Sequence, residues 1–138
     1  MAVFIDTNIL AAAKLKRDVD HKRANTLLHD AFYGEFGHIF TSDYVFDETI
    51  TLLLMRTKKY QLVREYGNSI LTSSIIEIIK VNDKIFEIAW DLFGSIQDKL
   101  LSFTDFTTIA IVEELKINKI MSFDKHFDGL DPKIIRIY

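Results

Sequence analysis

A chain of 138 residues with a formal net charge of −3 fits a single domain and is too short for two comfortable ones. Hydrophobic residues make up 49% of it, while one proline and five glycines leave no room for a flexible linker or a low-complexity segment. The chain has no cysteine, which excludes disulfides and thiolate zinc sites and fits a cytoplasmic location.

The chain opens with an apolar run, Ala2 to Ile5, that lacks polar alternation, as expected for a central strand covered on both faces. Asp6 interrupts this run, so we expect neither a signal peptide nor a membrane span. A helical pattern follows from Asn8, and hydrophobic periodicity predicts further helices at about 21–33, 43–55, 61–71, 83–93 and 102–115. Candidate N-caps precede three of these helices: Ser42 or Asp43, Asn82 or Asp83, and Ser102. Short apolar runs predict strands at 38–41, 75–81, 119–123 and 134–137.

Strands that alternate with helices predict one α/β domain over residues 1–138, with a central parallel sheet flanked by helices on both faces. The two consecutive helices between the second and third strands are the one departure from simple alternation. Ligands of such sheets gather beyond the carboxyl ends of the strands, so the residues that follow the strands are the first candidates for a site.

Four acidic residues stand where this fold would bring them to one end of the sheet: Asp6, Glu48, Asp105 and Asp124. Asp6 and Asp124 each close an apolar strand. Carboxylates packed together repel one another, and a hard divalent cation, Mg²⁺ or Mn²⁺, is the partner that usually neutralises them. The four acids therefore indicate metal-dependent hydrolysis of phosphodiester bonds.

Glu48 is the most informative of the four, because it lies on the apolar side of its helix, where an unpaired carboxylate is costly. That side also carries Tyr44, Val45, Leu52 and Met55. Its neighbour Asp47 points about a quarter-turn away, so both cannot reach one site. A glutamate at the edge of an apolar stripe could also reach water or a basic partner.

The three aspartates have local explanations as well. Asp6 can cap the helix that follows it, Asp105 has a capping-box spacing from Ser102, and Asp124 suits an Asx turn. His126 could act as a general base, but a surface histidine is more common, so we leave it out of the catalytic set.

The order and spacing of these segments resemble the PIN-domain nucleases, most closely the VapC-type toxins of prokaryotic toxin–antitoxin pairs. The likeness covers the whole chain. The segments that carry it are Phe-Ile-Asp-Thr-Asn around Asp6, Glu48 early in a central helix, Leu-Ser-Phe-Thr-Asp-Phe around Asp105, and Ser-Phe-Asp-Lys-His-Phe around Asp124.

The resemblance implies a metal-dependent endoribonuclease, a hydrolase that binds Mg²⁺ or Mn²⁺ through the four acids and cleaves RNA. Asp6 and Asp105 are the best candidates for direct ligands, while Glu48 and Asp124 complete the site, act through water or hold a second ion. Asn8 and Thr104 match positions that usually support the site. The resemblance further implies a homodimer that is held inactive by a small antitoxin protein. It implies no particular target RNA.

Two groups of basic residues could hold the RNA backbone, since lysine and arginine contacts to phosphate supply affinity with little sequence choice. They are Lys14, Lys16, Arg17, Lys22 and Arg23, and Arg56, Lys58, Lys59 and Arg64. Both groups could instead be solvated helix ends. The net charge does not decide this question, because removing the four site acids from it leaves the remaining chain slightly positive.

Other functions stay open. A phosphoryl-transfer domain of the receiver or haloacid-dehalogenase type also places an aspartate after the first strand, but its second carboxylate would stand where this chain has Asn8. A housekeeping RNA-processing nuclease would have the same site, and a non-catalytic PIN-like module could bind RNA or protein. An exposed apolar patch, and with it a dimer, is expected because large apolar residues are numerous, among them Phe32, Phe36, Phe40, Trp90 and Phe93.

Overall fold

The first strand lies at the centre of the sheet. In the computed structural model, which describes residues 1–130 and 133–138, five parallel strands have the order β3-β2-β1-β4-β5. They are β1 (Ala2–Ile5), β2 (His38–Ser42), β3 (Ile76–Ile79), β4 (Lys119–Met121) and β5 (Ile135–Ile137). Val3, Phe4 and Ile5 are fully buried, which confirms the prediction of a central strand covered on both faces.

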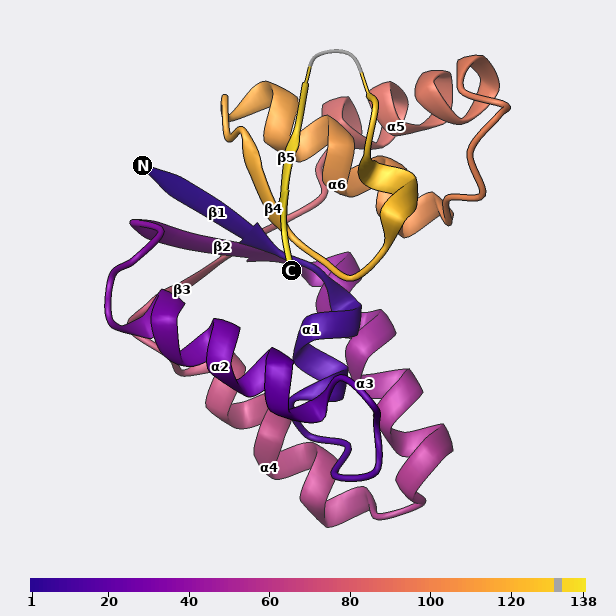
Figure 1. Cartoon of the computed structure of the whole chain (residues 1–138). Coiled ribbons are helices and arrows are strands. Elements are labelled where there is room, and N and C mark those ends of the chain that lie inside the picture. Colours follow the sequence, from indigo (N-terminus) through magenta and orange to yellow (C-terminus); the bar gives the residue numbers. More distant parts are fainter. Residues whose placement is uncertain (131–132) are drawn as a thin grey trace.

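Helices cover both faces of this sheet. Figure 1 shows α5 and α6 on one side and α1, α2 and α4 on the other. The α-helices are α1 (Thr7–Ala12), α2 (His21–Phe32), α3 (Asp43–Thr57), α4 (Tyr60–Leu71), α5 (Asp83–Ser95) and α6 (Phe103–Glu114), and a 3-10 turn, η1, spans Lys125–Phe127. The α/β fold with a parallel sheet between helices, predicted from the sequence, is confirmed. No helix among the described residues has the length and apolar character needed to cross a membrane.

The predicted N-caps fix where three helices begin. Ser42 accepts a hydrogen bond from the backbone N–H of Val45, and Asn82 accepts one from that of Ile85.

Strand β3 is shorter than predicted, because its partner β2 ends at Ser42 as α3 begins, and Ser42 is the last residue paired with β3. The N–H of Val81 bonds instead to the Asp43 carboxylate.

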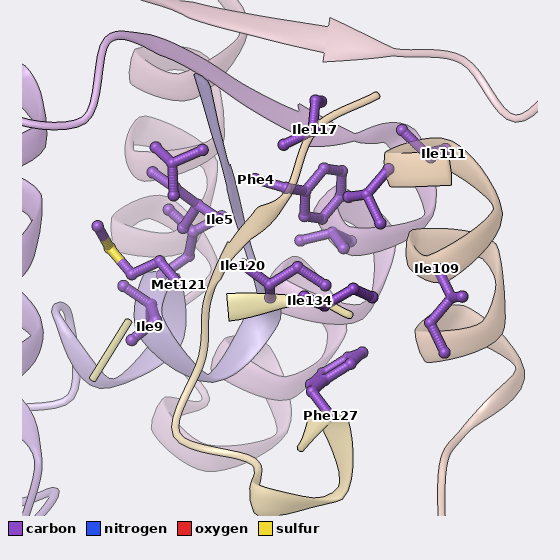
Figure 2. Close-up of a cluster of buried hydrophobic side chains, with 14 of the residues drawn as sticks. Phe4, Ile5, Ile9, Ile109, Ile111, Ile117, Ile120, Met121, Phe127 and Ile134 are labelled. Carbon is purple, nitrogen blue, oxygen red and sulfur yellow. The ribbon is translucent and has the colours of Figure 1, made fainter. Parts of the chain in front are cut away.

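The main core lies between the central strands and α6. Figure 2 shows Phe4 and Ile120 on the same side of the sheet as Ile109 and Ile111 of α6, whereas Ile5 and Met121 lie on the other side with Ile9 of α1. Every residue of α6 from Asp105 to Val112 is buried, so this helix has no solvent face along most of its length. Burying one large apolar side chain stabilises a fold by roughly 1.5–3 kcal/mol. The core therefore holds the first turn of α6 firmly against the end of β1.

Aromatic residues leave an exposed surface on α5. Of its apolar residues only Ile85 and Ala89 are buried, whereas Phe86, Trp90 and Phe93 are between 46% and 61% exposed. The rings of Trp90 and Phe93 are stacked, with centroids 5.3 Å apart. The prediction of an exposed apolar patch is thus confirmed for α5. Phe36 and Phe40, two of the residues counted in that prediction, are partly buried and pack against the main core.

Candidate active site

Asp6 is held rigidly where β1 passes into α1. Its Oδ1 accepts a hydrogen bond of 2.8 Å from the N–H of Thr7, and its Oδ2 accepts one of 2.7 Å from the hydroxyl of Ser122. The side chain is the N-cap of α1, as predicted from the residues around it, yet only 3% of the residue is exposed. Because a buried carboxylate is far costlier than a surface cap, capping alone does not account for this placement.

Ser122 connects three of the predicted site residues. Its hydroxyl donates to Asp6 and accepts from the side-chain amide of Asn8 at 3.1 Å and from the N–H of Asp124 at 3.0 Å. Asn8 also accepts a hydrogen bond from the N–H of Phe123. Asn8 therefore lies beside the site, as predicted, while the role of Ser122 was missed. Its only sequence signal is a lone serine that ends an apolar strand.

Asp105 has both a structural and an electrostatic role. It forms a complete capping box: the N–H of Ser102 donates to its Oδ2 at 2.8 Å, and its own N–H donates to the Ser102 hydroxyl at 3.1 Å. This fixes the carboxylate at the first turn of α6, where the helix dipole favours negative charge. The residue is 8% exposed, and its charge raises the pKa of Asp6.

Glu48 reaches the same place from α3, but its setting differs from the predicted one. The buried face of α3 consists of Val45, Thr49 and Leu53, so Glu48 lies at the edge of this face rather than inside an apolar stripe. The predicted stripe included Met55, which is 65% exposed. Glu48 acts on the pKa of both Asp6 and Asp105, whereas Asp47 is exposed and lies outside the pocket described next.

Asp124 forms the turn that follows β4. Its Oδ1 accepts a hydrogen bond of 2.9 Å from the N–H of His126 and is 2.8 Å from Nδ1 of the same residue. The expected Asx-type turn is therefore present. The side chain is 27% exposed and contributes to the raised pKa of Asp105. His126 contacts an acid of the site without lining the pocket.

The four acids line one cavity of about 330 Å³, which we call the acid pocket. Thr7, Asn8, Leu52, Arg56, Ser102 and a further acid, Asp18, which was not among the predicted site residues, are among the other residues that line it. Burial and the Asp105 carboxylate raise the pKa of Asp6 to about 7, although hydrogen bonds from Ser122 and Thr7 lower it. Burial raises the pKa of Asp105 to about 6, and the charges of Glu48 and Asp124 act in the same direction. The hydrogen bonds between Asp105 and Ser102 lower this pKa. Four acids from four parts of the chain thus share one site.

A second, more open hollow of about 450 Å³ adjoins the acid pocket, and we call it the side hollow. It shares Glu48, Leu52 and Arg56 with the acid pocket and is further lined by Asp47, Thr51, Met55 and Thr104. Thr104, a predicted supporting residue, therefore lies next to the acid pocket rather than in its wall. Its carbonyl oxygen accepts hydrogen bonds from the hydroxyls of Thr107 and Thr108.

The chemistry of the acid pocket fits a divalent cation. Carboxylate oxygens are the ligands that Mg²⁺ and Mn²⁺ prefer, and no basic side chain is among the main causes of the pKa shifts of Asp6 and Asp105. The hydroxyl oxygen of Thr7, in the wall of the pocket, is buried without a hydrogen-bond partner. Among the described residues, no three acidic or histidine side chains are already arranged to hold an ion. Several of the carboxylate oxygens point instead to hydrogen-bond donors of the protein.

The sequence matches the PIN domain family over residues 3–132, nearly the whole chain. The chain belongs to the PIN domain family. This confirms the resemblance noted in the sequence.

Known PIN proteins resemble this chain closely in length and fold. It is 30% identical over 130 residues to the VapC ribonuclease of Archaeoglobus fulgidus, covering 92% of this chain and 80% of that protein. It is 27% identical over 127 residues to the 23S rRNA-specific endonuclease VapC20 of Mycobacterium tuberculosis, covering 92% of each.

Two solved structures share the fold. The crystal structure of Mycobacterium tuberculosis VapC20, a toxin that cleaves the sarcin–ricin loop, matches with a TM-score of 0.78 and 25% identity and covers 88% of this chain and 89% of that one. VapBC2 of Rickettsia felis, bound to a DNA fragment from its promoter, matches with a TM-score of 0.71 and 18% identity and covers 98% of this chain and 97% of that one.

Proposed function

We propose that this PIN domain is a divalent-metal-dependent endoribonuclease and the toxin of a toxin–antitoxin pair. The observation that carries the proposal is the acid pocket, where four carboxylates from distant parts of the chain meet and where burial, together with neighbouring carboxylates, raises the pKa of Asp6 and Asp105. The ribonuclease activity named for the VapC relatives supports the same chemistry, and the pairing with an antitoxin is supported by the VapBC2 structure.

Each acid of the acid pocket has its own role in this proposal. Asp6 and Asp105, the most buried of the acids, would hold Mg²⁺ or Mn²⁺ directly, and Glu48 and Asp124 would complete the site. The bound ion would supply a hydroxide-like nucleophile from water and stabilise charge on the leaving oxygen. Ser122 fixes the orientation of the Asp6 carboxylate through its hydrogen bond. Because no residue needs to form a covalent intermediate, the absence of cysteine is compatible with this mechanism.

Incubation of the purified protein with structured RNAs tests the reaction. We expect internal cleavage in Mg²⁺ or Mn²⁺ that a chelator stops. Losing a residue that positions the metal should cost roughly 3–4 kcal/mol of transition-state stabilisation, so Asp6→Asn should be slower by two to three orders of magnitude. Cleavage that persists in the chelator, or that is equal in Asp6→Asn, would refute the assignment. No cleavage of any RNA would favour the non-catalytic alternative.

We further propose a homodimer formed through the aromatic surface of α5. Phe86, Trp90 and Phe93 are half-exposed, and apolar surface of this kind is commonly covered by a partner. Phe103, at the start of α6, packs against both Phe86 and Trp90, so the surface continues toward the acid pocket. A strict monomer in light scattering at tens of micromolar would contradict the dimer.

The toxin assignment predicts a small protein partner. The antitoxin would lay an extended or helical segment over the acid pocket and place a basic side chain near Asp6 and Asp105, which would exclude both metal and substrate. Co-expression with the adjacent upstream reading frame tests this. If no small protein co-purifies and expression of the chain alone does not slow growth, the housekeeping-nuclease alternative becomes the better account.

A further inference from the structure

One face of α3 separates the acid pocket from the side hollow. Glu48, Leu52 and Arg56 line both, and their spacing of four residues places them in a row along the helix. At a rise of 1.5 Å per residue, Glu48 and Arg56 are about 12 Å apart along the axis. A ligand that occupies both hollows must therefore cross this row, with the acids at one end and a cation at the other.

Arg56 is a cation without a partner in the part of the chain that the structure describes. It is exposed, and among the described residues no side chain or carbonyl forms a hydrogen bond or ion pair with it. Two other members of the two basic groups have contacts, since Lys14 lies over the ring of Tyr66 and Arg23 donates to the carbonyl of Tyr138; what distinguishes Arg56 is that it lines both hollows. Arg56 also suits the end of α3 through the helix dipole, but that role does not require the guanidinium to border two hollows.

The side hollow has the surface that a nucleoside needs. Met55, 65% exposed, and Leu52 provide apolar area for the face of a base, and Thr51 and Thr104 carry hydroxyls that can bond to a sugar or base edge. Asp47 is acidic, so this hollow by itself would not hold a phosphate. The phosphate must then be held by Arg56, the basic residue that lines the hollow.

We propose that the RNA strand crosses α3 over Leu52, with one nucleoside in the side hollow and its phosphate held by Arg56. The scissile phosphate then lies at the acid pocket, and Arg56 contacts a neighbouring phosphate. Arg56 is therefore a positioning residue, not a catalytic one. The guanidinium can donate two parallel hydrogen bonds to phosphate oxygens, which fixes the strand as well as attracting it. The inference rests on the proposed cleavage of RNA and assigns the path that the substrate takes.

Binding of a fluorescein-labelled RNA stem-loop, followed by anisotropy in the slow Asp6→Asn background with Mg²⁺, tests this path. Adding Arg56→Gln should weaken binding about tenfold, since a hydrogen bond to a charged group is lost. The slope of log K against log salt should become shallower by about 0.7–0.9, the value for one phosphate contact. Adding Arg56→Lys should keep the slope and regain part of the affinity. A purely structural role of Arg56 would leave the slope unchanged.

Lys119→Gln is the control, because Lys119 is the first residue of β4 and lies at the end of the sheet opposite to the acid pocket, so it should change neither affinity nor slope. In the cleaving protein, Arg56→Gln should raise KM while kcat stays nearly unchanged, with an unchanged melting temperature. An unchanged slope, or an equal loss in Lys119→Gln, would overturn the path while leaving the function intact. If the unsubstituted protein neither binds nor cleaves RNA, the proposed function fails and this inference fails with it.

Discussion

Neutralising Asp6 should make the metal-free protein more stable at neutral and alkaline pH. The pKa of Asp6 is about 7 in the folded protein, against an ordinary value of 3.8, because burial and Asp105 oppose its charge. The folded state therefore binds this proton more tightly than the unfolded chain does. This tighter binding of the Asp6 proton stabilises the folded state fully below about pH 4, and the stabilisation is lost as the pH rises through about 7. The full shift corresponds to about 4 kcal/mol, an upper bound because Asp105 titrates with it.

Asp6→Asn removes this loss. An asparagine can still accept the hydrogen bond from Thr7 through its Oδ1, but its Nδ2 is a donor and cannot accept the bond from the Ser122 hydroxyl, a loss that costs about 1 kcal/mol at every pH. In a chelator at pH 8 the variant should then be more stable than the unsubstituted protein by up to about 3 kcal/mol, the upper bound of about 4 less the cost of about 1. At pH 4 it should be slightly less stable, so the two curves of unfolding free energy against pH should cross.

Urea unfolding in EDTA buffers between pH 4 and pH 8 measures both curves. Asp47→Asn is the control, because Asp47 is exposed on α3 and lies outside the acid pocket, so its curve should run parallel to that of the unsubstituted protein. If the Asp6→Asn curve also runs parallel, without a crossing, burial and repulsion do not raise the pKa of Asp6, and the electrostatic account of the site is wrong.

Three further predictions concern other parts of the fold. Ser122→Ala should lower the free energy of unfolding by about 1–3 kcal/mol in urea unfolding and raise the pKa of Asp6 further, because a buried donor and acceptor are lost. Trp90→Ser should convert the dimer to a monomer, as measured by light scattering. Because the Trp90 side chain is 61% exposed, the variant monomer should melt at the same temperature as the unsubstituted chain measured as a monomer. Gly37→Ala should destabilise the fold by about 2 kcal/mol in the same urea assay, because Gly37 has φ of +77° and a Cβ there would collide with the Met1 carbonyl.

Local rules predicted most of the fold and three of the four acids. The apolar run before Asp6, the Ser102 capping box and the turn at Asp124 are each read over a few neighbouring residues, and each forms as expected. The parallel direction of the strands then follows from the helices that connect them. It brings Asp6 and Asp124 to the same end of the sheet, beyond the carboxyl ends of β1 and β4.

The features that the sequence did not predict depend on contacts between residues that are far apart in the chain. Ser122 bonds to Asp6, 116 residues away, and a lone serine after an apolar strand does not predict this. The buried face of α3 was misplaced because Thr49, a polar residue, is fully buried. Its hydroxyl is satisfied by the carbonyl of Val45 in the same helix, so burial costs little and the apolar periodicity is misleading. Glu48 was nevertheless predicted at the site, although the reason given for it was incomplete.

Calorimetric titration with Mn²⁺ at pH 7.5 tests most directly whether the four acids form a metal site. We expect the unsubstituted protein to bind Mn²⁺ and to release a fraction of a proton, mainly from Asp6, whose pKa of about 7 leaves it partly protonated at this pH. Asp6→Asn and Asp105→Asn should each bind Mn²⁺ at least tenfold more weakly, while the exposed-site control Asp47→Asn should bind it equally well. No binding at millimolar Mn²⁺, or equal binding by Asp6→Asn, would contradict the metal site.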